Sequence, residues 1–167
     1  GALANYGFEM LTAGGDWHFN AACAFQTRAQ APECVYEGSN SLRQTAGGVA
    51  YQTFEFRNAS ATVPQVAFSG WHLGGAARVE IAAYATNDLE NPTQTIAIPV
   101  AAATNWAPFA EPMQELGGGA TEFLRVTLSA DEDTAYWDGL NFAVDIGTNR
   151  SSMRFHAGAE NQGLVPQ

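Results

Sequence analysis

Hydrophobic and polar residues alternate with a period of two along most of the chain, and Gly, Asn, Asp or Pro residues separate the alternating runs. These runs are rich in Val, Ile, Phe, Tyr, Thr and Trp, whereas a helical period is hard to find. The pattern therefore predicts an all-β chain. The predicted strands are Tyr6–Met10, Trp17–Ala22, Ser41–Thr45, Val49–Arg57, Gln65–His72, Arg78–Ala85, Gln94–Val100, Trp106–Leu116, Glu122–Ser129, Tyr136–Val144 and Ser152–His156.

Several predicted strands carry one apolar face, as in the series Leu124, Val126 and Leu128. Strands with one buried face in a chain of this length indicate two antiparallel sheets packed face to face, a β-sandwich. The uniform texture gives no reason to divide the chain into two folded units. We expect a sandwich domain over residues 1–146 and a C-terminal extension over residues 147–167.

Composition narrows the classes of partner. Charged residues make up 14% of the chain, the basic ones are seven arginines without a lysine, and the formal net charge is −10. Nucleic acids and anionic membrane surfaces need a basic stripe, and these arginines lie far apart in the sequence. The longest apolar stretch, Ile96 to Ala103, is interrupted by Pro99 and is shorter than the roughly 20 residues of a membrane-spanning helix. A neutral ligand, a cation or another protein fits the composition better.

Several features favour a secreted, extracellular or cell-surface location. The chain starts without an initiator Met, which suits a mature secreted protein or a trimmed chain equally well. Cys23 and Cys34 are spaced for a disulfide that closes a small loop, with a reduced pair as the alternative. Asn58 and Asn149 each open an N-x-[ST] acceptor pattern for glycosylation, which also occurs by chance.

Asp138 raises a question of electrostatics. Alternation in Tyr136–Val144 places Asp138 on the same face as aromatic and aliphatic residues, and a buried carboxylate needs a cation or several donors. Glu9, in a short predicted strand, is a candidate neighbour, and two carboxylates brought together would bind Ca²⁺. The segment Glu37–Leu42 would add oxygen ligands, Asn40 among them. A carboxylate that is hydrogen-bonded or paired with Arg is the alternative.

Five short motifs follow one another along the chain: N-x-GFE (Asn5–Glu9), G-x-x-SL (Gly38–Leu42), SGW (Ser69–Trp71), W-x-x-F (Trp106–Phe109) and YWDGL (Tyr136–Leu140). Their order resembles that of carbohydrate-binding modules, specifically the jelly-roll families with a galactose-binding-domain-like sandwich. The resemblance spans about Asn5 to Phe142 and implies the same fold. In these families, the Glu of the first strand and the Asp that opens the last strand commonly hold a structural calcium, which implies this role for Glu9 and Asp138. The chain departs from the pattern at Gly139, where a second Asp is frequent, and in the cysteine loop.

Aromatic residues provide candidates for sugar binding, because the face of a pyranose ring packs well on an aromatic ring. Alternation turns Trp137 away from the Asp138 face, toward the outside of the sheet. We therefore expect a platform of Trp137, Tyr51 and Tyr84, with burial in the core or contact with the chain itself as the alternative.

The sequence contains no pattern typical of an enzyme. Its histidines, His18, His72 and His156, are scattered, and no H-E-x-x-H, G-x-S-x-G, P-loop or Rossmann fingerprint is present. The acidic run Asp131–Asp133 lies in a predicted turn, where adjacent side chains project apart. We expect a non-catalytic protein.

Two functions remain. In the first, the sandwich is a structural subunit of a self-assembling surface fibre or matrix, because a tail laid on the sheet edge of another copy would generate a filament. The alternative is a carbohydrate-binding module that binds a polysaccharide by aromatic stacking. The sequence alone favours assembly slightly. The side chains expected to contact another copy are Leu3, Met153, Phe155, Leu164 and Val165.

Overall fold

The computed structural model describes Leu3, Phe8, residues 17–55, Asn58, residues 61–86 and 88–147, and the backbone of residues 154–155. Within these residues the chain forms two antiparallel sheets and one short 3-10 helix, η1 (Pro32–Cys34). The strands are β1 (His18–Phe19), β2 (Cys23–Thr27), β3 (Asn40–Gln44), β4 (Val49–Glu55), β5 (Gln65–Gly74), β6 (Ala77–Tyr84), β7 (Gln94–Val100), β8 (Ala103–Glu115), β9 (Phe123–Ala130), β10 (Ala135–Asp145) and β11 (Arg154–Phe155).

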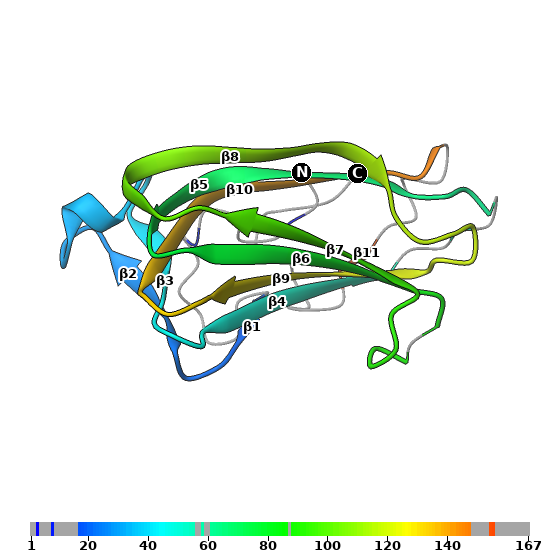
Figure 1. Cartoon of the computed structure of the whole chain (residues 1–167), viewed down its shortest axis with the longest axis horizontal. Coiled ribbons are helices and arrows are strands. Elements are labelled where there is room, and N and C mark those ends of the chain that lie inside the picture. Colours follow the sequence, from blue (N-terminus) through cyan, green and yellow to red (C-terminus); the bar gives the residue numbers. More distant parts are fainter. Residues whose placement is uncertain are drawn as a thin grey trace.

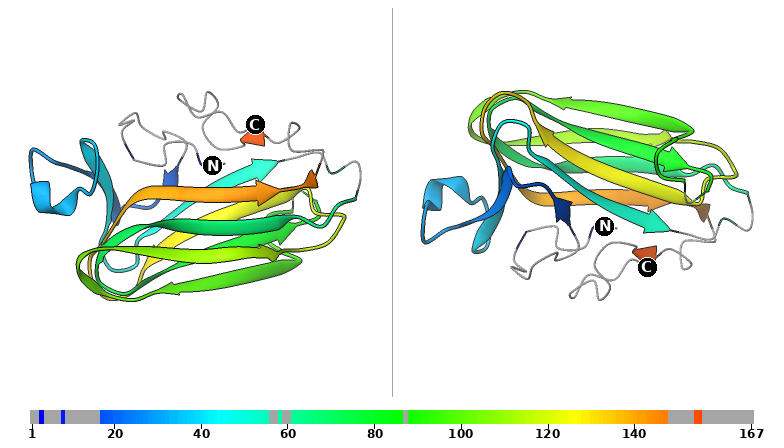
Figure 2. Two further views of the ribbon diagram at one scale, coloured as in Figure 1. Left: turned by 90° about the horizontal axis from the view of Figure 1, so that it is seen from above. Right: turned by 90° about the horizontal axis from the view of Figure 1, so that it is seen from below.

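The two sheets form the layers of a jelly-roll sandwich. Sheet A has the order β1-β4-β9-β6-β7, and β11 also pairs with β4; sheet B has the order β2-β3-β10-β5-β8. Figure 1 shows β8, β5 and β10 in one layer and β7, β6, β9 and β4 in the other. The long strands run along the length of the molecule, and η1 lies at one end of the sandwich (Figure 2). The all-β, two-sheet prediction is confirmed.

Most predicted strands are present with small shifts at their ends. Gln94–Val100 has the bounds expected from alternation, and β5 continues two residues beyond the predicted His72. β2 was not predicted, because Cys23–Thr27 was interpreted as part of a cysteine loop. β2 instead pairs with β3 from Cys23 opposite Gln44 to Thr27 opposite Asn40.

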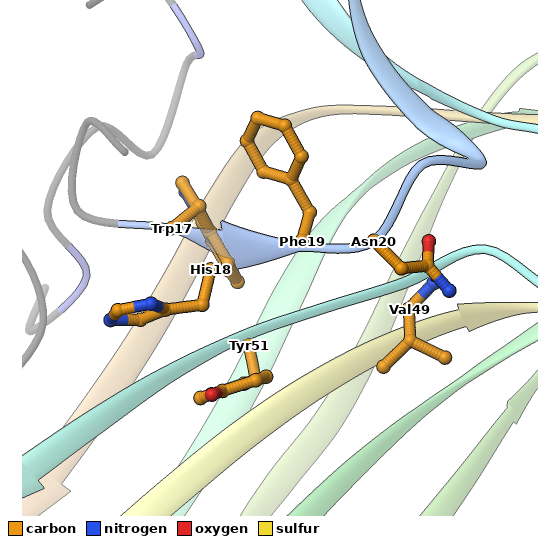
Figure 3. Close-up of a pocket in the computed structure, with 6 residues that line it drawn as sticks. All are labelled: Trp17, His18, Phe19, Asn20, Val49 and Tyr51. Carbon is orange, nitrogen blue, oxygen red and sulfur yellow. The ribbon is translucent and has the colours of Figure 1, made fainter. Parts of the chain in front are cut away.

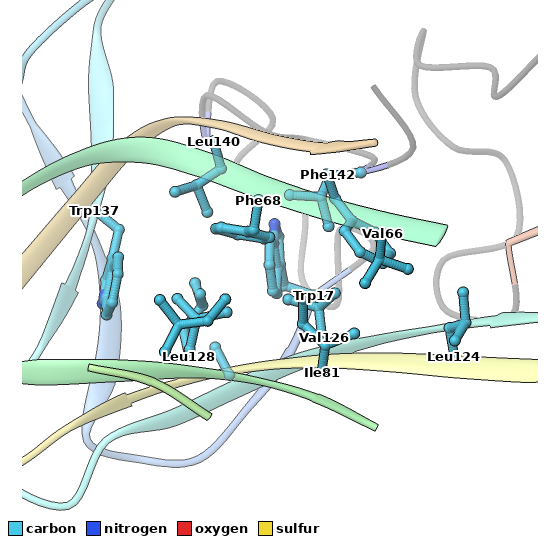
Figure 4. Close-up of a cluster of buried hydrophobic side chains, with 14 of the residues drawn as sticks. Trp17, Val66, Phe68, Ile81, Leu124, Val126, Leu128, Trp137, Leu140 and Phe142 are labelled. Carbon is cyan, nitrogen blue, oxygen red and sulfur yellow. The ribbon is translucent and has the colours of Figure 1, made fainter. Parts of the chain in front are cut away.

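The core lies between the sheets and follows the alternation. In sheet A, Val126 and Leu128 of β9 point inward; in sheet B, Phe68 of β5 and Phe142 of β10 meet them, and all four side chains are at most 1% exposed. Figure 4 shows these side chains extending from opposite layers into one cluster. Burial of each large apolar side chain contributes roughly 1.5–3 kcal/mol relative to exposure. This rigid core leaves the outer faces of both sheets free to carry function.

A bulge in β10 changes which residues face the core. The register with β5 shifts between Asp138 and Asn141, and Gly139 adopts φ +55°, a conformation that glycine tolerates best. Ala135 and Trp137 therefore point inward before the bulge, and Leu140, Phe142 and Val144 point inward after it. The prediction that Asp138 shares a face with Leu140 and Phe142 is wrong. Asp138 instead points to the outer side of sheet B.

No helix among the described residues is long and apolar enough to cross a membrane.

Candidate functional site

A cavity of about 500 Å³ opens where β1 meets β4 at the edge of sheet A. Figure 3 shows the six residues that line it, with His18 and Tyr51 side by side. The antiparallel register sets this pair, because His18 lies directly opposite Tyr51. Their rings stack with centroids 5.1 Å apart and planes 17° apart. The lining residues are Trp17, His18, Phe19, Asn20, Val49 and Tyr51.

Arg125 of β9 extends this site across the outer face of sheet A. It lies opposite Thr53 of β4, and its Nε donates a hydrogen bond of 2.9 Å to Thr53 Oγ1. The guanidinium carbon lies 4.4 Å from the centroid of the Tyr51 ring, which is a cation–π distance. The same carbon lies 6.0 Å from the ring centroid of Tyr84 on β6. We call the outer surface formed by His18, Tyr51, Arg125 and Tyr84 face A.

The Tyr84 ring packs under face A and offers a ligand little surface. Its side chain is 5% exposed. It belongs to a small apolar cluster with Ala82, Phe123 and Leu89. The accessible aromatic surface of face A is therefore at the Tyr51 and His18 end, beside the cavity.

Of the predicted platform, the structure brings Tyr51 and Tyr84 to one face and places Trp137 elsewhere. Trp137 is 0% exposed in the core, and its Nε1 donates a hydrogen bond of 2.8 Å to Gln44 Oε1. Gln44 in turn donates to Leu128 O in the opposite sheet. Trp137 therefore joins the two sheets, and its assignment as a sugar contact is wrong. The bulge between Asp138 and Asn141 reverses the inward and outward positions of β10, so regular alternation places Trp137 on the wrong side of the sheet.

A second aromatic cluster, which the sequence analysis missed, lies on the outer face of sheet B. Tyr36 stacks on Trp71 of β5 with centroids 3.9 Å apart and planes 16° apart. Trp106 of β8 lies 5.8 Å from Tyr36 and donates a 3.0 Å hydrogen bond from Nε1 to Glu33 O. We call the surface of Tyr36, Trp71 and Trp106 face B. The chain's own loop occupies much of this aromatic surface.

Asp138 holds that loop against sheet B. Its Oδ2 accepts hydrogen bonds of 3.1 Å from the backbone N–H groups of Tyr36 and Glu37, and its Oδ1 accepts one of 2.8 Å from Gly139. The side chain is 0% exposed. Burial is the main cause that raises the pKa of Asp138 to about 7, against the three N–H donors, which lower it; the nearby Glu37 charge adds to the rise. Asp138 is thus the hydrogen-bonded carboxylate of the second sequence interpretation.

Calcium at this position stays a prediction. Glu9 lies outside the described residues, and the part of the chain that is described contains no group of three or more His, Cys, Asp or Glu side chains that could hold a metal ion. Asn40 is 5% exposed on β3. The groups that contact the Asp138 carboxylate are N–H donors, which are not calcium ligands. The described residues therefore do not form a calcium shell.

The predicted disulfide is not formed: Cys23 and Cys34 are both free. Cys23 is buried on the core side of β2, where its Sγ contacts Val49 O at 3.4 Å and Gln44; burial raises the pKa of its thiol. Cys34 ends η1 on the outer side, where its carbonyl accepts a hydrogen bond from Ser41 Oγ. Sheet B separates the two sulfur atoms. The unpredicted strand β2 is the physical reason for the error.

The remaining predicted sites lie in different environments. Asn58 is half-buried, and the Nδ2 atom to which a glycan would be attached donates to the carbonyls of Thr62, Gly119 and Thr121. These bonds argue against its modification. Asn149 lies outside the described residues.

The predicted assembly residues give the fibre hypothesis no support. Leu3 is 2% exposed within the chain's own core cluster, so it is not free to contact another copy. The backbone of Phe155 in β11 pairs with Phe54 of β4 in the same sheet. Met153, Leu164 and Val165 lie outside the described residues.

Comparison with known proteins identifies the fold. No family model matches the chain, and no curated relative matches it. Among solved structures, the chain is similar to the carbohydrate-binding module TmCBM61 in complex with beta-1,4-galactotriose, with 15% identity, 86% of this chain and 98% of that chain covered, and a TM-score of 0.56. It is also similar to the CBM22-2 xylan-binding domain of Paenibacillus barcinonensis Xyn10C, with 10% identity, 83% and 97% coverage, and a TM-score of 0.56.

A third similar structure belongs to a different kind of protein. It is the enzymatically active domain of tailspike protein 4 from bacteriophage CBA120, with 11% identity and a TM-score of 0.59; the match covers 86% of this chain but 21% of that one. At these identities the likeness shows the fold alone. The chain has the jelly-roll fold of carbohydrate-binding modules, as its motifs predicted.

Proposed function

We propose that this chain is a non-catalytic, extracellular carbohydrate-binding module that binds a polysaccharide through face A. The observation that carries the proposal is the stacked His18–Tyr51 pair at the cavity of about 500 Å³, with Arg125 beside it. The volume lies in the range of about 300–1,000 Å³ that is usual for small-molecule sites.

The chemistry of face A suits a sugar. A pyranose presents apolar C–H groups on its faces and hydroxyl groups around its edge, so it binds where an aromatic ring lies next to hydrogen-bonding groups. The exposed His18 ring and the edge of Tyr51 supply aromatic surface at the cavity, and Arg125 supplies hydrogen-bond donors beside it. The faces of the Tyr51 ring are covered by His18 on one side and Arg125 on the other. The similar modules in complex with a galactotriose or described as xylan-binding support the same class of ligand.

The fibre-subunit hypothesis is less well supported. It depends on terminal side chains that are free to contact another copy, and Leu3 is buried in the chain's own core. The similar solved structures include carbohydrate-binding modules that this chain matches over nearly their whole length. Sedimentation of the purified chain separates the two functions, because a binding module stays a discrete particle at increasing concentration.

The test is a binding measurement with a matched control. Soluble β-1,4-galactan and xylan are titrated into the protein by calorimetry, with Tyr51→Ala as the variant and Tyr36→Ala as its control on face B. We expect wild-type binding to at least one polymer, a loss of about tenfold or more in Tyr51→Ala, and little change in Tyr36→Ala. Absence of binding to both polymers, or equal binding by Tyr51→Ala, would overturn the proposal.

A further inference from the structure

We infer that Arg125 makes face A selective for glycans that carry carboxylate groups at intervals along a neutral backbone, such as uronic acid substituents. This inference rests on the proposed function and adds the substrate class. The inference is based on the groups that surround the Arg125 guanidinium in a chain that is acidic overall.

Arg125 is held in place by neutral groups. Thr53 Oγ1 accepts the hydrogen bond from Nε at 2.9 Å, and the Tyr51 ring supports the guanidinium plane at 4.4 Å. The terminal nitrogens of the guanidinium donate no hydrogen bond within the described part of the chain. A planar fork of donors is therefore already oriented before a ligand arrives, which lowers the entropy lost on binding.

Arg125 has no carboxylate partner in the described residues, although the chain carries 17 acidic residues and seven arginines. Its directly opposite neighbours are Thr53 on β4 and Ala82 on β6, which are both uncharged. The ion pairs of the described residues both belong to Arg78, which contacts Glu80 at 3.6 Å and Asp131 at 2.7 Å. Glu80, the acid diagonal to Arg125 on β6, is thus engaged by another arginine.

A half-buried guanidinium without an acidic partner matches a planar anion best. Two parallel N–H···O bonds to one carboxylate satisfy the geometry of the fork, whereas neutral hydroxyl groups form weaker bonds. Tyr51 lies under the same guanidinium and beside the cavity. A sugar in the cavity beside Tyr51 can therefore direct a carboxylate substituent to Arg125.

The net charge of the chain limits how acidic the glycan can be. At −10, the protein repels a dense polyanion, but at physiological ionic strength charges more than about 8–10 Å apart are largely screened. A single carboxylate therefore pairs with Arg125 at short range. In a dense polyanion, the other carboxylates of the glycan lie close to acidic side chains of the protein and are repelled. This balance favours sparse carboxylates over a polyuronate.

The test uses pairs of polymers that differ only in their carboxyl groups. Glucuronoxylan is compared with its carboxyl-reduced form, and β-1,4-galactan with the same polymer lightly oxidised at C6. Calorimetry is performed on the wild-type protein, Arg125→Gln and Arg125→Lys, and chemical unfolding confirms that the variants are folded. We expect the wild type to bind the carboxylated member of at least one pair about tenfold more tightly, and less so as salt increases.

The variants separate this inference from the proposed function. Arg125→Gln should bind the two members of a pair with equal affinity, whatever its affinity for the neutral member, and Arg125→Lys should recover only part of the preference because it lacks the fork. Equal wild-type binding of both members, or a preference that persists in Arg125→Gln, would overturn the selectivity alone. Failure of the wild type to bind any of the four polymers would overturn the proposed function and this inference with it.

Discussion

Face A and face B are both aromatic surfaces on the outside of the same sandwich, yet their rings have different neighbours. On face B, Tyr36 from the chain's own loop stacks on Trp71, and Trp106 donates to Glu33 O. On face A, the His18–Tyr51 pair borders a cavity, and the terminal nitrogens of Arg125 have no acceptor among the described residues. We therefore expect binding at face A, where a cavity and guanidinium donors adjoin the rings, and not at face B.

The two faces differ in whether their polar groups form hydrogen bonds within the chain. Face B is held by Asp138, whose carboxylate accepts three backbone N–H groups under the loop. On face A, the Arg125 guanidinium donates a single hydrogen bond within the described residues, from Nε to Thr53 Oγ1. We infer that changes on face B act mainly on stability, whereas changes on face A act mainly on binding.

The largest expected effect is a pH dependence of stability that comes from Asp138. A folded-state pKa near 7, against an ordinary 3.8, means that protonation favours the folded state. The contribution of the protonated carboxyl to stability is fully present below the unfolded-state pKa and is lost as the pH rises through the folded-state pKa of about 7. The free energy of unfolding falls by roughly 4 kcal/mol over this range. Urea unfolding of the wild type should therefore show a falling contribution of Asp138 between pH 4 and 7. Buried His72 has the opposite effect, because its lowered pKa reduces stability toward acid pH.

Asp138→Asn is the matched variant, because it removes the titration and keeps an amide oxygen as acceptor. Asn keeps one of the two acceptor oxygens and loses the other, which changes the overall stability, so the slope of stability with pH is the readout. We expect the falling slope to disappear, which leaves only the loss of stability toward acid that His72 causes. An unchanged slope in Asp138→Asn would show that Asp138 titrates normally.

The next effect separates the two aromatic faces directly. Trp71→Ala removes the ring beneath Tyr36 and should lower the free energy of unfolding by about 2 kcal/mol, because it loses both a stacked pair and buried area. Tyr51→Ala, on the half-exposed face A, should cost about 1 kcal/mol. Chemical unfolding at one pH measures both, and a larger loss in Tyr51→Ala would contradict the division of roles.

Gly139→Ala tests how the loop of face B depends on the bulge. An added Cβ would lie 2.8 Å from Glu37 Oε1 and 3.3 Å from Trp71 Cδ1, and the φ of +55° disfavours a side chain. We expect a loss of roughly 1–2 kcal/mol in urea unfolding with unchanged glycan binding. Gly118→Ala is the control, because its Cβ would meet no atom within 4 Å. Equal stability of the two variants would mean that Glu37 and the loop simply move aside.

The fold was predictable from the sequence because strands with one buried face alternate regularly. Gln94–Val100 was predicted with its observed bounds. The error at Trp137 has a local cause, since alternation keeps its phase only where no bulge intervenes, and the left-handed Gly139 interrupts it. A glycine inside an otherwise regular strand was the available signal.

The candidate site was predictable only in part. Tyr51 and Tyr84 were chosen as aromatic residues of strands, and the structure places them on one face with Arg125 between them. Arg125 was missed because its significance depends on its surroundings: a tyrosine 74 positions earlier lies under its guanidinium, and no carboxylate of the described residues pairs with it. The signal present in the sequence was a single arginine at an outward position of an otherwise neutral strand.

The smallest expected effect concerns His72, which lies between the two faces on β5 and points into the core. It is 1% exposed, and its ring lies 5.3 Å from that of Trp137. Within the described residues, neither ring nitrogen forms a hydrogen bond of good geometry, and the Gly75 backbone offsets only part of the effect of burial on the pKa. Burial lowers the pKa of His72, so its contribution to stability is present above the ordinary 6.5 and is lost as the pH falls through the folded-state pKa.

His72→Leu removes both unpaired nitrogens and should raise the free energy of unfolding by about 1 kcal/mol at pH 8, and by more at pH 5. His72→Gln keeps polar atoms in the same place and should show no gain at pH 8. Comparing variants at the same pH cancels the contribution of Asp138, so a loss of stability in His72→Leu at both pH values would show that the imidazole ring is required for packing against Trp137.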